Sequence, residues 1–353
     1  MTASAIEREA RPGAIKCVVW DLDNTLWSGV LVEDRAVELR PEIRDVLRTL
    51  DERGILHSIA SRNHFEDARA RLQELGLWEY FLAPQIRWDS KVRSIEAIAK
   101  ELNLGLDALA FVDDDPFERE SVAFALPMVT CIDAVRTPEL VGMRELTPRF
   151  VTEDSRLRRS MYRDDEARKR AEEDWQGTDE EFLATLRMQF HIAPAQEADL
   201  RRAEELTVRT NQLNSTGVTY SLEELDQLRR SPRHSLWMAS LDDRFGAMGR
   251  IGLALVEREA EHWTLRLLLM SCRVMSRGVG ALLLNFLIGQ AQLAGVRLRA
   301  DFIPNDRNRA MAVTYAFAGF KKVGERDGVH QLELASPVAR PVPAYVTLTV
   351  GQG

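Results

Sequence analysis

Two aspartates lie directly after a short apolar run, in the string Asp21-Leu22-Asp23-Asn24-Thr25. A carboxylate can attack phosphorus and form an aspartyl-phosphate once the substrate's negative charge is neutralised. We therefore predict that Asp21 is the nucleophile and Asp23 the general acid and base. Two carboxylates this close repel each other unless a cation lies between them, and Mg²⁺ is the natural one. The pattern predicts metal-assisted phosphoryl transfer, and the alternative is a strand followed by an Asx-type turn.

Two further polar side chains follow at positions that such a site needs. The run 55–60 is apolar and ends at Ser61, whose hydroxyl would contact the transferring phosphoryl group. Lys91 opens a segment with helical periodicity and would balance the charge of Asp21. Taken alone, Ser61 is typical of a turn or helix cap and Lys91 of a solvated surface.

A second acidic group lies after the strand-like run 108–112, where Asp113 and Asp114 stand at its tip. Alone, such a group is typical of an exposed turn, but behind the first motif it predicts the rest of a metal site. The predicted metal ligands are Asp21, Asp23, Asp113 and Asp114. The residues predicted to contact phosphate are Asn24, Thr25, Ser61, Arg62 and Asn63.

The elements that position these residues fill the intervals between the motifs. A helix led by Pro41 occupies much of the interval from Asp21 to Ser61. A helix near 67–75 and a strand near 81–86 fill the interval from Ser61 to Lys91. Because neither interval has room for a lid domain, the site is expected to stay open, which suits a substrate presented on a large carrier.

The composition is that of a soluble enzyme. The chain has 353 residues, of which 45% are hydrophobic, enough for two cores. A net charge of −8 argues against nucleic acid or an anionic membrane as the main partner. We expect a cytoplasmic protein, because no window resembles a membrane span and the N-terminus lacks the apolar core of a signal peptide. The three cysteines are dispersed and indicate neither a disulfide framework nor a zinc site.

The organisation changes after about residue 145. The first 135 residues alternate strand-like and helix-like segments, which predicts a parallel sheet with the motifs at its carboxyl edge. The stretch 153–182 is dense in charge and predicts solvated helices, one of them opened by a capping box from Thr178 to Glu181. We predict an N-terminal tail over 1–14, a phosphoryl-processing domain over 15–145, a helical connector over 146–185, a further domain over 186–336 and a Pro-containing tail over 337–353.

A glycine loop marks the second half. Strand-like runs end at Met270, and the loop around Arg277, Gly278 and Gly280 leads into an apolar helix over 282–293. A helix N-terminus that follows such a loop presents free backbone N–H groups to an anion such as a phosphate. The alternative is a plain tight turn into a helix.

These motifs resemble known families. The first domain resembles the haloacid-dehalogenase (HAD) superfamily of phosphatases and phosphotransferases through Asp21-x-Asp23-x-Thr25, Ser61, Lys91 and Asp113-Asp114. More narrowly, WDLDNTLWSGVL and FVDDDPFERE resemble the FkbH-like family of polyketide and hybrid biosynthesis, as do the segments 210–214, 243–246 and 271–275. The glycine loop and the segment 308–320 resemble GNAT acyltransferases. The resemblance implies an α/β fold: a Rossmann-like HAD parallel sheet of HAD-IIIC type without a large cap, a helical connector and a GNAT-like α+β domain.

The FkbH-like resemblance implies a glyceryl transferase. Such an enzyme takes a phosphorylated three-carbon substrate, 1,3-bisphosphoglycerate, loses phosphate and leaves a glyceryl thioester on the phosphopantetheine arm of an acyl carrier protein. The loop of Arg277, Gly278 and Gly280 would bind that arm. The family commonly has Cys where this chain has Ala60, so an acyl-carrying thiol would have to be another cysteine: Cys272, just before the glycine loop, or Cys17, four residues before Asp21. Two alternatives stay open: a Mg²⁺-dependent phosphatase acting on a phosphorylated carrier-bound intermediate, and a non-catalytic protein that docks a carrier.

Overall fold

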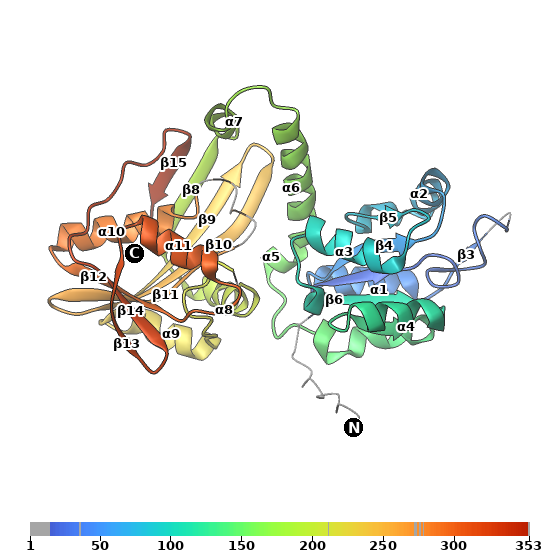
Figure 1. The fold of residues 1–353 in the computed structure, drawn as a ribbon, viewed down its shortest axis with the longest axis horizontal. Helices are drawn as coiled ribbons and strands as arrows, with labels where there is room; N and C mark the ends of the chain where they lie inside the picture. The colour runs from blue at the N-terminus through green and yellow to red at the C-terminus, as the bar shows by residue number, and fades with distance from the viewer. Residues whose placement is uncertain are drawn as a thin grey trace. The chain divides into compact units, whose positions relative to one another are not determined.

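The chain divides into two compact units between Arg163 and Asp164, inside the predicted connector (Figure 1). The computed structural model describes residues 15–34, 37–210, 212–271, 274, 277 and 279–351. The predicted fold class is confirmed, because unit 1 contains a parallel sheet between helices and unit 2 a second, mixed sheet with its own helices. Within the described residues, none of the helices combines the length and apolar character needed to cross a membrane.

The sheet of unit 1 has five parallel strands in the order β5-β4-β1-β6-β7. They are β1 (Cys17–Trp20), β4 (Leu56–Ser61), β5 (Gln85–Ile86), β6 (Leu109–Asp113) and β7 (Thr130–Asp133). Strand β1 is central and buried on both faces, which explains its unbroken apolar sequence. Motifs that follow β1, β4 and β6 therefore meet at one edge of the sheet.

Helices cover both faces of this sheet. One face packs against α1 (Ile43–Glu52) and α2 (Phe65–Glu74), and the other against α3 (Lys91–Glu101) and α4 (Pro116–Ala125). A small hairpin of β2 (Trp27–Ser28) and β3 (Glu38–Leu39) follows the first motif, and no larger insertion separates the described strands of unit 1. The short helix α5 (Glu153–Arg156) comes near the end of the unit.

The strand predicted near 81–86 is shorter than expected. Only Gln85–Ile86 pairs with β4, and Phe81 forms an isolated bridge to His57. Between them Ala83 has a positive φ of 48°, and Pro84 lacks the N–H that a ladder needs. The backbone therefore leaves the extended conformation in the middle of this segment.

The connector is helical, as predicted. It contains α6 (Arg158–Glu173) and α7 (Asp179–Thr185). Thr178 caps α7, and its side chain and that of Glu181 satisfy each other's backbone N–H groups in a capping box. The charge-dense sequence thus forms helices with locally paired side chains.

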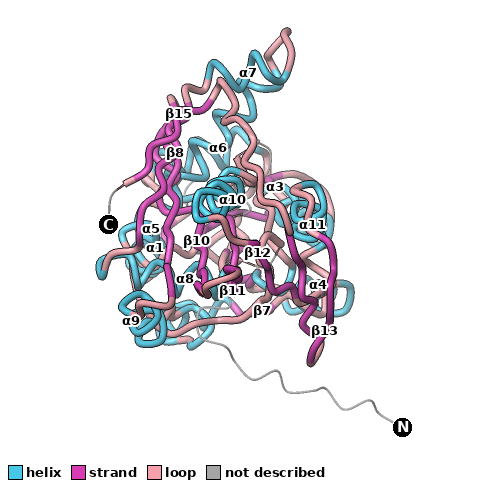
Figure 2. Tube along the Cα trace, turned by 90° about the vertical axis from the view of Figure 1, so that its left-hand side faces the viewer, coloured by secondary structure: helices cyan, strands magenta, loops and turns pink. Residues whose placement is uncertain are grey.

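Unit 2 is built on an eight-stranded sheet in the order β13-β14-β12-β11-β10-β9-β8-β15. Its strands are β8 (Met188–Pro194), β9 (His234–Asp243), β10 (Gly246–Arg258), β11 (His262–Met270), β12 (Arg297–Phe302), β13 (Lys321–Arg326), β14 (Val329–Leu334) and β15 (Val346–Val350). Strand β15 lies in the segment predicted as a tail, yet it runs alongside β8 in parallel (Figure 2).

Two pairs of helices cover the sheet of unit 2. Helices α8 (Leu200–Arg209) and α9 (Leu222–Arg230) pack on one face. Helices α10 (Leu282–Ala294) and α11 (Arg309–Phe317) pack on the other. The predicted helix after the glycine loop is therefore present as α10.

Candidate active site

Three predicted site residues meet at the carboxyl edge of the sheet in unit 1. Asp21 directly follows β1, and its backbone N–H donates to Val112 O of β6 at 2.9 Å. Ser61 ends β4 and Asp113 ends β6, the two strands that flank β1. The side chains of all three are nearly buried, so the edge presents a recessed polar site.

Lys91 lies at the first position of α3, as predicted, and supplies the cation of this site. Its ammonium donates to Asp21 Oδ1 and to Ala60 O, the latter at 2.7 Å. It also forms an ion pair with Asp113 Oδ2 at 3.2 Å. Because only 5% of Lys91 is exposed, it is held between two carboxylates with little access to solvent.

Asp21, Asp113 and Asp114 form what we call the carboxylate cluster. One oxygen from each lies within 4.8 Å of the others. Asp113 Oδ2 is buried and accepts no hydrogen bond, so it is available as a ligand. Three carboxylates facing one ammonium leave an excess of two negative charges. Oxygen donors with that excess fit Mg²⁺, and the exposure of Asp114 leaves room for the waters that Mg²⁺ retains.

Burial shapes the protonation of the site. It raises the pKa of Asp21, although Lys91 and a hydrogen bond with the Ser61 hydroxyl pull that pKa down. Burial likewise raises the pKa of Asp113 to about 6, against the opposing charge of Lys91. Burial alone would lower the pKa of Lys91, but the charges of Asp21 and Asp113 raise it above its ordinary value. Lys91 is therefore a fixed cation at neutral pH.

The carboxylate of Asp23 lies outside the carboxylate cluster. Its Oδ1 accepts from the Trp27 indole at 2.8 Å and from the Leu31 N–H at 3.0 Å, and its Oδ2 accepts from Asn63 Nδ2 at 2.8 Å. These donors hold the carboxylate in one orientation, which suits an acid and base more than a ligand. The hydrogen bond from Trp27 to Asp23 was not predicted from the sequence, although the two residues are only four positions apart.

Asn24 and Thr25 shape the loop that carries both aspartates. Asn24 has a positive φ of 51°, and its side chain accepts from Gly29 N. Thr25 Oγ1 donates to Asp114 Oδ1 at 3.3 Å and accepts from the Asp114 N–H at 3.1 Å. Their observed contacts are thus with the protein, and Thr25 ties the first motif to the acidic pair.

The two residues after Ser61 have different surroundings. Arg62 is exposed and forms an ion pair with Glu118 at 2.7 Å, and its Nε donates to Asp89 O at 3.3 Å. Asn63 is buried and, besides its bond to Asp23, has its Oδ1 without a hydrogen-bond partner. Arg62 therefore lies on the rim of the site and Asn63 inside it.

The predicted pantetheine loop is only partly described. Gly278 and Cys272 lie outside the described residues. Arg277 is buried and forms ion pairs with Asp165 and, at 3.9 Å, with Asp243, so its guanidinium faces the protein. A Cβ added at Gly280 would meet no atom within 4 Å, so the loop is open at that point.

The two described thiols are poor nucleophiles. Cys17 is fully buried, which raises its pKa far above the ordinary value. Cys131 is partly buried, and its pKa is raised to about 11. Ala60 is fully buried, packs in the core between the sheet and α3, and offers no thiol.

Part of the chain is similar in sequence to a known phosphatase. No family model matches the sequence. It is 31% identical over 136 residues to magnesium-dependent phosphatase 1 from Homo sapiens, a match that covers 33% of this chain and 76% of that protein.

Solved structures each match part of the chain. The N-terminal part of the protein BF1531 from Bacteroides fragilis, containing a phosphatase domain complexed with Mg, is 26% identical with a TM-score of 0.34. That match covers 38% of this chain and only 40% of the Bacteroides chain. An acetyltransferase of the GNAT family from Streptococcus pneumoniae is 20% identical with a TM-score of 0.33, covering 41% of this chain and 98% of its own.

Proposed function

Because this chain belongs to the family of magnesium-dependent phosphatase 1, we propose that unit 1 hydrolyses a phosphate ester through an aspartyl-phosphate on Asp21. One observation carries the proposal. Asp21 contacts Lys91 at the carboxyl edge of the sheet and shares the carboxylate cluster with two acidic residues. A buried nucleophile beside a fixed cation, with a divalent-cation site next to it, is what phosphoryl transfer requires.

The residues divide the reaction into two steps. In the first, Asp21 attacks phosphorus as the bond to the leaving oxygen breaks, and Asp23 gives that oxygen a proton. In the second, Asp23 takes a proton from water, whose oxygen attacks phosphorus and releases Asp21 and inorganic phosphate. Lys91 balances the charge of Asp21 and of the phosphoryl oxygens. Mg²⁺, held by the carboxylate cluster, would supply further neutralisation of the phosphate charge when bound.

Replacement of the nucleophile tests this proposal. With Mg²⁺ and p-nitrophenyl phosphate, we expect Asp21→Asn to lower kcat at least about a thousandfold while the fold is kept. Asp115→Asn is the matched control, because Asp115 caps α4 by accepting from Phe117 N, a role that Asn also fills. Phosphate release by the wild type without a requirement for Mg²⁺, or undiminished turnover by Asp21→Asn, would reject the mechanism.

We propose a second candidate, glyceryl transfer to an acyl carrier protein, on the strength of the FkbH-like strings. It would use the same phosphate chemistry on 1,3-bisphosphoglycerate and then pass the glyceryl group to the phosphopantetheine thiol. Ala60 has no thiol, and burial raises the pKa of the Cys17 and Cys131 thiols. These properties favour direct transfer to the carrier thiol over a relay through one of these positions. A dephosphorylation of a carrier-bound intermediate would need no acyl relay at all.

Intact-mass measurement of a holo carrier protein separates these outcomes. The carrier is incubated with the chain, Mg²⁺ and 1,3-bisphosphoglycerate. A gain of one glyceryl group supports transfer, and Cys272→Ala tests whether that thiol takes part. An unchanged carrier mass, together with phosphate release from a phosphorylated carrier, supports the phosphatase. Unchanged biological output from Asp21→Asn would instead favour a docking protein.

A further inference from the structure

Strands β11 and β12 of unit 2 are parallel neighbours that separate partway along their length. They pair from His262–Arg297 to Leu265–Ala300, and no later pair joins their described residues. Strand β11 nevertheless continues to Met270 and β12 to Phe302. Separated parallel strands leave backbone N–H and C=O groups that need other partners.

The segment 213–216, which we call the wedge, supplies those partners. On the β11 side, Met270 N donates to Leu213 O at 2.8 Å and Ser215 N to Leu268 O at 2.9 Å. On the β12 side, Ile303 N donates to Ser215 O at 2.9 Å. Asn308, which is buried, donates its side-chain N–H to the backbone of the wedge. The gap is therefore closed by the chain itself, and an extended ligand cannot pair with β11 there.

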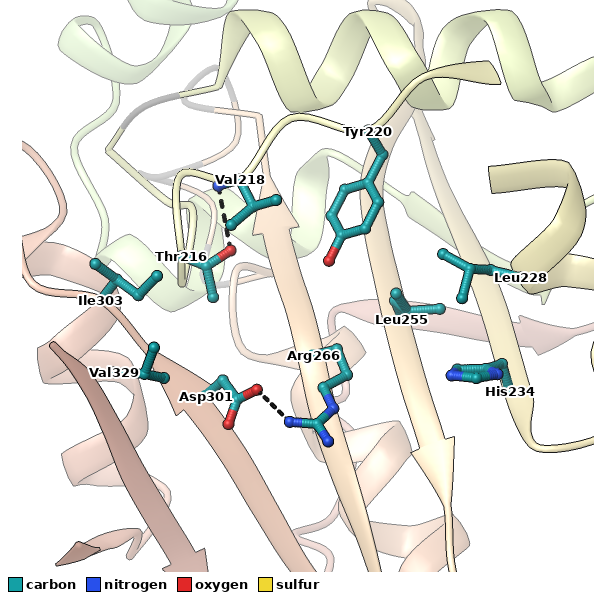
Figure 3. Close-up of a pocket in the computed structure, with 10 residues that line it drawn as sticks. All are labelled: Thr216, Val218, Tyr220, Leu228, His234, Leu255, Arg266, Asp301, Ile303 and Val329. Atoms are coloured by element: carbon teal, nitrogen blue, oxygen red, sulfur yellow. Dashed lines mark hydrogen bonds and ion pairs between the residues drawn. The ribbon is translucent and has the colours of Figure 1, made fainter. Parts of the chain in front are cut away.

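Beyond the wedge the chain crosses one face of the sheet and closes a pocket of about 260 Å³ against α9 (Figure 3). Apolar side chains form much of its wall: Val218, Leu228, Leu255, Ile303 and Val329. The volume is roughly that of nine water molecules. It accommodates a small molecule and not a whole dinucleotide cofactor.

A β-bulge brings Arg266 to this pocket. Leu255 pairs with Leu267 and Val256 with Leu265, which leaves Arg266 as the extra residue of β11. Its guanidinium donates to Asp301 Oδ2 at 2.7 Å (Figure 3) and, by two N–H groups, to Glu257. The bulge thus places an ion pair in the floor of the pocket.

The charges at the pocket compensate one another. Glu257 also accepts from Arg233 at 2.9 Å, so two guanidinium groups face the carboxylates of Glu257 and Asp301. Hydrogen-bonding capacity remains at Asp301 Oδ1 and at the hydroxyl of Tyr220, which points into the pocket (Figure 3). Burial raises the pKa of the Tyr220 phenol, so this hydroxyl is a donor at neutral pH.

We propose that this pocket binds an uncharged small molecule that combines an apolar body with amide and hydroxyl groups. The apolar wall takes the body, and the Tyr220 hydroxyl and the free oxygen of Asp301 bond polar groups of the ligand. An anion would gain little from Arg266, because its guanidinium is already paired with Glu257 and Asp301. A polyamine would gain little from Asp301, because its carboxylate is already paired with Arg266. The proposal concerns unit 2 and is independent of the phosphatase chemistry of unit 1.

Panthenol is a suitable probe, because it is uncharged and carries geminal methyl groups, an amide and hydroxyls. Its relative pantothenate differs by a carboxylate in place of one alcohol. Isothermal titration of the full chain should give saturable panthenol binding in the millimolar range, at least about tenfold tighter than pantothenate or spermidine. Absence of panthenol binding, or tighter binding of either charged probe, would overturn the proposal.

Two variants locate the binding. Val218→Trp should fill the pocket and abolish panthenol binding. Val313→Trp is the matched control on α11 and should leave panthenol binding intact, because Val218 and Val313 are similarly exposed, at 40% and 45%. Tyr220→Phe should weaken panthenol binding about tenfold through loss of one hydrogen bond. Binding that survives both Val218→Trp and Tyr220→Phe would show that panthenol binds elsewhere and would overturn the assignment.

Discussion

Replacing Lys91 with Met should destabilise unit 1 in a way that Mg²⁺ reverses. Met has a similar length and fills the same volume, so the main change is loss of a buried charge. Lys91 contacts Asp21 and lies 3.2 Å from Asp113 Oδ2. Without it, the carboxylate cluster has no cation inside the protein among the contacts described for it.

The magnitude follows from the contacts. At an effective dielectric constant of about 20, two unit charges 3.2 Å apart attract by about 5 kcal/mol. Part of this is offset because the buried ammonium no longer has to be desolvated. Breaking a buried ion pair by removing one partner costs about 3–5 kcal/mol. We expect the free energy of unfolding to fall by about 3 kcal/mol in the absence of divalent cations, with one carboxyl of the cluster taking up a proton.

Saturating Mg²⁺ should reduce that loss to under about 1 kcal/mol. Mg²⁺ should displace the proton that the variant cluster takes up, because the ionised cluster carries one more negative charge than that of the wild type, and binding to the folded state stabilises it. Turnover should still be lost, because Lys91 also balances the phosphoryl charge. Urea unfolding followed by tryptophan fluorescence, with chelator and with Mg²⁺, measures both states.

Lys100→Met is the matched control, because Lys100 lies on the same helix but is exposed. It should change the free energy of unfolding by less than about 0.5 kcal/mol under both conditions. An equal destabilisation of Lys91→Met with and without Mg²⁺ would refute the reasoning, since it would mean that Lys91 acts through packing and not through charge.

Three further predictions concern residues around the site. Burial lowers the pKa of His57 to about 4, so between pH 4 and 6.5 only the unfolded state binds a proton at this residue. In saturating Mg²⁺, the free energy of unfolding should therefore rise by about 3 kcal/mol from pH 4 to pH 6.5 through His57. Urea titrations of His57→Gln should show a smaller rise over the same pH range. Trp27→Phe removes a donor to Asp23 and should lower kcat about tenfold with KM unchanged, and an altered KM alone would count against a positioning role. Thr25→Val removes both bonds to Asp114 and should weaken Mg²⁺ affinity about 10–100-fold, measured by calorimetry without substrate.

The centre of the site was predictable because it depends on strand ends. Asp21, Ser61 and Asp113 each close an apolar run, and parallel strands bring such ends to one edge. Lys91 was predictable for a related reason, since its segment has helical periodicity and starts there. The residues around Asp23 were not, because Leu31 and Asn63 come from loops whose path no periodicity describes.

In unit 2, the wedge and Arg277 likewise form contacts that local sequence patterns do not predict. The strand-like run that ends at Met270 predicts β11, but not that β11 separates from its parallel neighbour β12 after four residue pairs. The segment that fills the gap is polar and reads as a loop. Arg277 follows a pattern typical of phosphate binding, yet its partner Asp165 lies 112 residues away in sequence, on α6. Pairing over such a distance is decided by the fold and leaves no local trace.

Charge balance distinguishes two buried ionic groups among the described residues. In unit 2, the guanidinium groups of Arg168 and Arg277 face the carboxylates of Asp165 and Asp243. The two positive and two negative charges of this group balance one another, and its ion pairs join α6 to β9. In unit 1, the carboxylate cluster exceeds its single ammonium by two charges, which equals the charge of one Mg²⁺ ion. Asp21 and Asp113 are buried beside a single ammonium, so the buried part of this excess is costly without a second cation. We therefore expect the stability and the chemistry of the site at the carboxyl edge of β1 to depend on the same ion, and the Lys91→Met experiment measures that dependence directly.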